Sequence, residues 1–208
     1  WGGRYYVLGL SVSWGPGTSA WIPLDHPMSP VPEGDREAVA GTVRSLLGDR
    51  KLKKRGHNVA YDGAVAEAVY GVRVRSVRID TQHAAHEVDP DQRRTLDALA
   101  LRYLSRFGWD WPLHDWGRKW LALMEAKAAG SGEPTFLEGR AAVPAAEAAA
   151  AAAELETAKS AAENPWLHLE RVPYKILAEY GCCDAEATWD LADTLFPVMA
   201  EEGVGKRH

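Results

Sequence analysis

Two short stretches constrain this chain more than any other feature, because each sets an aspartate one helical turn after a polar side chain. The first is Gly-His-Asn-Val-Ala-Tyr-Asp at positions 56–62, in which Asn58 precedes Asp62. The second is Tyr-Gly-Cys-Cys-Asp at positions 180–184, in which Tyr180 precedes Asp184. Residues four apart share one face of a helix, so each pair can point into a single cleft. Two helices that each present an aspartate indicate a binuclear metal site for phosphoryl chemistry.

The composition indicates one globular domain with room for an insertion. The chain has 208 residues, of which 46% are hydrophobic and 25% are charged, as in ordinary proteins with a full hydrophobic core. No apolar run approaches membrane-spanning length and the start does not resemble a signal peptide, so we expect no membrane contact and a cytoplasmic location. A net charge of −5 argues against binding nucleic acid by charge alone. It leaves open an approach to phosphates through bound metal ions.

Strand and helix signals alternate along the chain after an opening hairpin. Positions 5–14 and 18–24 are rich in β-forming residues and flank a Gly-Pro-Gly turn, which predicts two antiparallel strands. Further segments follow from apolar periodicity and from residues that start or end helices, among them Gly71 at one helix end and Pro173 at the start of the last helix. In chain order they are a helix over 35–48, a short strand into 56, a helix over 61–70, a strand over 77–79, a helix over 95–107 and a last helix over 173–196. This order predicts an α/β domain with a mixed sheet flanked by helices.

The composition changes between residues 108 and 172. Four tryptophans come first, at positions 109, 111, 116 and 120, and a Gly-Ser-Gly linker follows at 130–132. An alanine run then covers 145–162, and the high helix propensity of alanine predicts a solvated helix there. We therefore expect 108–172 to be a helical insertion rich in tryptophan and alanine, within a domain that covers residues 1–208.

Three further stretches accompany the two aspartate motifs. They are Trp-Ile-Pro-Leu-Asp-His at 21–26, Ile-Asp-Thr at 79–81 and Leu-Asp-Ala-Leu-Ala-Leu-Arg-Tyr-Leu at 96–104. Taken in this order, the chain resembles the 3′–5′ exonuclease (proofreading) domain of family A DNA polymerases, the bacterial DNA polymerase I type. The stretch at 56–62 is similar to the second exonuclease motif of that family, and the stretch at 180–184 to its third motif in the tyrosine form. The resemblance covers 5–107 and 173–197 and leaves out the insertion.

The resemblance implies a fold, a reaction and roles for five residues. The fold is ribonuclease H-like, and the reaction is two-metal hydrolysis at a single-stranded 3′ end of DNA that releases nucleoside monophosphates. Asp184 would ligate the metal on the nucleophile's side, Asp62 would support the second metal, and Tyr180 would position the attacking water. His57 and Asn58 would shape the cleft and contact the terminal nucleotide. The oxygen ligands favour Mg²⁺ or Mn²⁺, and the expected partner is a C-terminal polymerase domain in a bacterial or phage-infected cell.

One part of the family pattern is missing from the chain. The first motif of the family is an Asp-x-Glu on the opening strand, but only Trp-Gly-Gly-Arg-Tyr-Tyr precedes the strand at 7–14. We expect these two carboxylates, with their strand, in a segment upstream of Trp1, because Asp62, Tyr180 and Asp184 occur together and the chain does not begin with Met. The alternative is a catalytically inactive scaffold domain of a polymerase. A stand-alone ribonuclease D-like exonuclease acting on RNA is a further interpretation within the same superfamily.

Other candidate features have simpler explanations. His83, His86 and Glu87 have a spacing that zinc ligands use, but no distant ligand completes a zinc site, so we interpret them as ordinary histidines. Asp80 is expected to cap a helix or order the edge of the sheet. The basic run over 50–55 either touches a nucleic-acid backbone or is a solvated edge. The tryptophans either stack unpaired bases or pack within the insertion or against a polymerase domain, and we favour packing.

Overall fold

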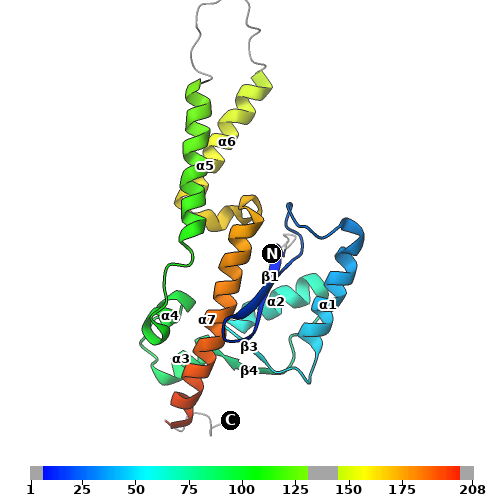
Figure 1. Cartoon of the computed structure of the whole chain (residues 1–208), viewed down its shortest axis with the longest axis vertical. Coiled ribbons are helices and arrows are strands. Elements are labelled where there is room, and N and C mark those ends of the chain that lie inside the picture. The colour runs from blue at the N-terminus through cyan, green and yellow to red at the C-terminus, as the bar shows by residue number, and fades with distance from the viewer. Residues whose placement is uncertain (1–6, 131–144, 202–208) are drawn as a thin grey trace, which may run out of the picture. The chain divides into compact units, whose positions relative to one another are not determined.

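The computed structural model describes residues 7–130 and 145–201. This part of the chain combines helices with short strands (Figure 1) and divides into two compact units. The first, called the core unit here, takes in Trp1–Gly108 and Ala178–His208, and the second, the helical unit, is Trp109–Leu177. The five candidate site residues all belong to the core unit. Among the described residues, no helix combines the length and the apolar character that crossing a bilayer requires.

The core unit opens with the predicted hairpin. Strand β1 (Gly9–Gly15) pairs antiparallel with β2 (Thr18–Pro23). Gly17 has a φ of +62° in the turn between them, a conformation that glycine adopts without a steric cost. A Cβ on Gly9 of β1 would lie 2.2 Å from the indole of Trp21 on β2. Position 9 therefore needs a glycine. The tight turn explains why the hairpin was predictable from sequence.

A strand–helix–strand unit follows and carries the first motif. After η1 (Glu33–Asp35) and α1 (Arg36–Gly48), strand β3 (Lys54–Gly56) leads into α2 (Val59–Tyr70) and then β4 (Val77–Asp80). The two strands are parallel, as expected for strands joined by a helical crossover. Gly71 ends α2 in the left-handed conformation with φ +62°, which confirms its predicted capping role.

The core unit also contains helices α3 (Thr81–Val88) and α4 (Leu96–Leu104). The long helix α7 (Tyr174–Glu201) begins directly after Pro173 and belongs to the core unit from Ala178 on. Leu99, Leu191 and Leu195 are fully buried in one cluster with side chains of β4 and α3. Burial of such side chains stabilises the fold by roughly 1.5–3 kcal/mol each. The cluster therefore fixes β4, which follows the first motif, against the helix that carries the second.

The sheet differs from the expected one. The structure is of mixed α and β type, but the strands of residues 7–130 and 145–201 form two separate pairs, β1–β2 and β3–β4. One pair is antiparallel and the other parallel. A single mixed sheet would need a hydrogen-bonded ladder that joins the two pairs, and no such ladder forms in this part of the chain.

The helical unit contains the tryptophan-rich and alanine-rich segments. Helices α5 (Trp111–Gly130) and α6 (Ala145–Glu163) are followed by η2 (Pro165–Arg171). A Cβ on Gly117 would lie 2.3 Å from the carbonyl oxygen of Ala161, so α5 and α6 touch through their backbones. The rings of Trp116 and Trp120 stack with their centroids 5.2 Å apart. These two tryptophans therefore pack within the helical unit. The second and third residues of the predicted Gly-Ser-Gly linker, and the acid-free segment 1–6, lie outside the described residues.

Candidate functional site

The first motif forms the turn between β3 and α2. A Cβ on Gly56 would lie 2.3 Å from Val59 Cγ2, so only glycine allows the chain to turn this closely. Asn58 has φ 57° and ψ 48°, in the left-handed region that asparagine tolerates better than most residues. The turn places Asp62 in the first turn of α2. The sequence Gly-His-Asn therefore sets the direction in which the helix leaves the strand.

Asp80 holds this turn in place. Its Oδ1 accepts hydrogen bonds from the backbone N–H groups of Asn58 at 3.0 Å, Gln82 at 2.9 Å and His83 at 3.4 Å. Its Oδ2 accepts from the N–H of Val59 at 2.8 Å. The first N–H groups of a helix lack partners within the helix, and a negative charge is favourable there. One carboxylate thus caps α3 and also anchors the start of α2, which confirms the predicted capping role of Asp80.

The electrostatics of the first motif follow from this arrangement. Desolvation by neighbouring atoms, and then the charge of Asp80, raise the pKa of Asp62 from 3.8 to about 6, although the residue as a whole is exposed. Burial lowers the pKa of His57 against the opposing charge of Asp80. The hydroxyl of Thr81 donates to the carbonyl of Gly56 at 3.3 Å and lies 2.9 Å from His57 Nδ1. His57 Nδ1 therefore faces the Thr81 hydroxyl, and a hydrogen bond to the backbone of Arg94 partly opposes the lowering of the His57 pKa.

The second motif lies in the first half of α7. The hairpin approaches the helix closely at this motif. Tyr180 and Asp184 are four residues apart within the helix, and both are half-buried. Gly181 lies between them. A Cβ at this glycine would come within 3.1 Å of Trp21 Cδ1 and 3.3 Å of Ser11 Cβ. The glycine therefore lets both strands of the hairpin pack directly against the helix beside the motif.

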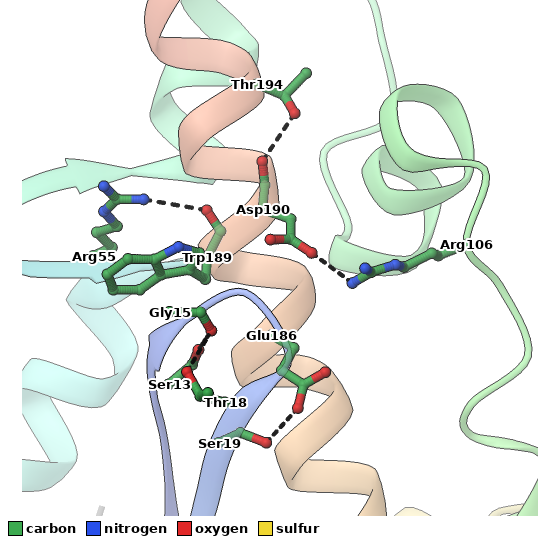
Figure 2. Close-up of polar contacts among 10 residues, drawn as sticks. All are labelled: Ser13, Gly15, Thr18, Ser19, Arg55, Arg106, Glu186, Trp189, Asp190 and Thr194. Carbon is green, nitrogen blue, oxygen red and sulfur yellow. Dashed lines mark hydrogen bonds and ion pairs between the residues drawn. The ribbon is translucent and has the colours of Figure 1, made fainter.

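Three polar contacts anchor α7 just beyond the second motif (Figure 2). Ser19 Oγ of β2 donates to Glu186 Oε1 at 2.5 Å. After α4, Arg106 pairs with Asp190 at 2.7 Å. The third anchor comes from β3 and starts at Arg55. Each contact joins α7 to a different element, so the helix cannot shift without breaking one of them.

Arg55 joins the first motif to the helix that carries the second. It precedes Gly56 directly, and its guanidinium lies 4.1 Å from the centre of the Trp189 ring. It also pairs with Asp193 at 2.6 Å and donates to the carbonyl of Trp189 at 3.4 Å. Of the residues in the predicted basic run, Arg55 therefore makes its contacts inside the core unit. A pocket of about 230 Å³ lies beside it, and none of the five candidate residues lines this pocket.

The carboxylates of the described residues do not by themselves fit a pair of metal ions. In the described part of the chain, no three His, Cys, Asp or Glu side chains gather into a group that could hold a metal. This applies to Asp62 and Asp184, and equally to His83, His86 and Glu87. A two-metal site needs carboxylates that bridge and flank both ions, and two aspartates fall short of such a donor set.

Comparison with known proteins identifies the family. The sequence profile described as 3′–5′ exonuclease matches residues 3–124. This chain belongs to the 3′–5′ exonuclease domains of family A DNA polymerases. A curated relative, DNA polymerase I of Pseudomonas aeruginosa, is 37% identical over 101 residues, which are 47% of this chain and 11% of that protein. The family match includes Asp62 and Asp80, ends before Tyr180, and extends past residue 107 into the segment expected to be an insertion.

The residues that anchor α7 in this exonuclease domain lie outside its sequence motifs. Glu186, Asp190 and Asp193 each bind a different element. Their spacing of four and three residues puts them on one side of the helix, and this pattern was available in the sequence. Their partners could not be read from it, because Arg55 and Asp193 are 138 residues apart.

Proposed function

We propose that this exonuclease domain hydrolyses the terminal phosphodiester bond at a single-stranded 3′ end of DNA and releases nucleoside monophosphates. The proposal includes a ribonuclease H-like fold, a neighbouring polymerase domain, and action in the cytoplasm of a bacterial or phage-infected cell. The observation that carries it is the first motif. Asp62 lies inside the matched segment, at the start of a helix held by Asp80, and Asp184 is presented by a second helix of the same core unit.

The proposed roles follow the chemistry of each side chain. Asp62 and Asp184 supply oxygen donors, which suit Mg²⁺ or Mn²⁺, and further donors are needed for two ions. The hydroxyl of Tyr180 orients the attacking water by a hydrogen bond. His57 and Asn58 contact the terminal nucleotide. Because the pKa of Asp62 is raised to about 6 in the metal-free protein, its charged form, and with it the affinity for a metal ion, should increase as the pH rises through 6.

The decisive experiment follows release of nucleotides from 5′-labelled single-stranded DNA with Mg²⁺. Asp184→Asn and Asp62→Asn should each abolish release, whereas Tyr180→Phe should slow it by a smaller factor, since it removes one hydrogen bond. Asp91→Asn, an exposed aspartate outside both motifs, is the matched control and should leave the rate unchanged. Full activity in Asp184→Asn would refute the site assignment.

One observation favours a second candidate function, that of a non-catalytic scaffold domain. The described residues contain no group of three potential metal ligands. A scaffold should release no nucleotide from DNA, and Mn²⁺ should not raise its melting temperature, because only a ligand that binds the folded state stabilises it. An RNA strand of the same sequence in the same assay tests the ribonuclease D-like alternative. Faster release from RNA than from DNA would support that alternative.

A further inference from the structure

Six basic residues of the core unit gather where the chain enters β3 and β4. The two entering segments, 49–54 and 73–76, contain a single acid, Asp49. Against it they carry six basic side chains, which are those of Arg50, Lys51, Lys53, Lys54, Arg73 and Arg75. The whole chain has a net charge of −5, so this concentration of positive charge runs against its average.

The backbone brings the two segments together. The hydroxyl of Ser76 donates to the carbonyl of Arg50 at 2.6 Å, and the N–H of Lys54 donates to the carbonyl of Ser76 at 3.0 Å. The N–H of Arg75 donates to the carbonyl of Leu47 at 2.9 Å, at the end of α1. Because β3 and β4 are parallel, both entering segments lie at one end of the strand pair. The first motif follows β3 at the opposite end.

Two of the six cations are already used within the unit. The Lys54 ammonium donates to the carbonyls of Asp49 at 2.7 Å, Leu52 at 3.1 Å and Arg75 at 3.0 Å. Arg73 pairs with Glu67 at 3.0 Å. The other four are exposed and form no ion pair within the described residues. These four, called the basic edge here, are Arg50, Lys51, Lys53 and Arg75.

We propose that the basic edge binds the phosphodiester backbone of nucleic acid, at the opposite end of the strand pair from the first motif. Four exposed cations on adjacent loops repel one another, and a polyanion relieves this repulsion. Lysine and arginine also displace condensed counterions from nucleic acid, which drives binding without regard to sequence. The four cations are exposed on two neighbouring loops, so they suit a row of phosphates better than a single small anion. This binding does not depend on whether the domain hydrolyses DNA.

The test measures binding of a fluorescein-labelled DNA duplex with a 3′ single-stranded overhang, by anisotropy, with EDTA present so that no hydrolysis occurs. The variant replaces all four residues of the basic edge by glutamine. Each lost phosphate contact should make the plot of log K against log salt shallower by about 0.9. For the four substitutions together, we expect the magnitude of this slope to decrease by about 2–4. The affinity near 50 mM salt should weaken by about tenfold or more. Lys54 is kept, because its ammonium holds the loops together.

A control variant removes the same number of exposed cations elsewhere and should keep the wild-type slope. Its substitutions are Arg36→Gln, Arg118→Gln, Lys119→Gln and Lys127→Gln. Equal thermal melts of the two variants show that both are folded. An unchanged slope in the basic-edge variant, equal losses in both variants, or no measurable binding by the wild type would each overturn the proposal. Tighter binding of polyglutamate than of DNA at the same four residues would assign the edge to an acidic protein and overturn it too.

Discussion

The two motif regions of the core unit are held in opposite ways. The first, around Asn58 and Asp62, lies at the start of a helix and is fixed by a single carboxylate, Asp80, through backbone N–H groups. The second, around Tyr180 and Asp184, lies within a long helix whose backbone is already satisfied. It is fixed through side chains that reach α7 from several elements.

This difference predicts different responses to mutation. A single change at the first motif removes several hydrogen bonds to N–H groups that have no helical partner. Changes at the second motif remove one anchor at a time and leave the others in place. The first region should therefore be fragile at one residue, and the second should lose stability in smaller steps.

The largest effect should come from Asp80→Ala. It leaves the N–H groups of Asn58, Val59 and Gln82 without their acceptor, and we expect the free energy of unfolding to fall by about 3 kcal/mol. Urea unfolding followed by circular dichroism measures this loss. Asp80→Asn keeps one acceptor oxygen and should lose about half as much. A loss below about 1 kcal/mol in Asp80→Ala would show that water replaces these bonds.

The next effect compares one glycine from each region. Gly181→Leu places atoms where Trp21 and Ser11 already lie and should cost about 1–3 kcal/mol by forcing the hairpin away from α7. Gly63 of α2 is the matched control, because a Cβ there meets nothing within 4 Å. Gly63→Leu should be neutral or stabilise by up to about 1 kcal/mol through helix propensity. Thermal melts of both variants check the difference, and equal losses would contradict it.

A smaller effect is expected for Arg55→Met, which removes a cation from the Trp189 ring and from Asp193. Because the ion pair is partly exposed, we expect a loss of about 1–2 kcal/mol, most of it from the stacked, half-buried guanidinium. Arg44→Met removes an exposed ion pair with Glu37 and no stacking contact, and should cost less than about 0.5 kcal/mol. Hydrogen exchange in 57–62 and 180–184 should rise together in Arg55→Met. A rise in one segment alone would show that Arg55 does not couple the motifs.

The smallest effect should depend on pH, because Asp62 is exposed and solvent screening reduces what its pKa shift contributes to stability. The pKa of Asp62 is raised from 3.8 to about 6 in the folded protein, so the folded state holds this proton more tightly than the unfolded state does. Stability therefore decreases as the pH rises from about 4 to about 6, and the loss persists above 6. With EDTA present, Asp62→Asn should raise the melting temperature at pH values above 6 and leave it unchanged below 4. An equal difference at every pH would refute the shift.

Elements with local signals could be predicted from the sequence. The hairpin follows from its Gly-Pro-Gly turn, α2 from its capping Gly71, and α7 from the proline before it. Asp80 was also recognisable as a cap, because its partners Gln82 and His83 are neighbours in sequence. Helix α3 was missed. It has only eight residues, too few for a periodic apolar pattern to emerge.

The candidate site was predictable only as a set of motifs. The hydrogen bonds from Asn58 and Val59 to Asp80 join residues more than twenty positions apart in sequence. The ion pair of Arg55 with α7 joins residues 138 positions apart. Neither sequence spacing nor propensity encodes such distant pairs, because they form only when packing brings the elements together. Strand pairing between distant segments is also not encoded locally. The sequence therefore predicted one mixed sheet, whereas the structure has two separate strand pairs.

The three carbonyls around the Lys54 ammonium bear on covalent modification. Acylation of a lysine removes its charge and needs a free, deprotonated amine. Lys51 and Lys53 are exposed and can be acylated without any change in the backbone. Lys54 must first leave its three acceptors, and an acylated Lys54 could not return to them. Among three neighbouring lysines, one is therefore shielded by the fold, and its modification would keep the two loops apart.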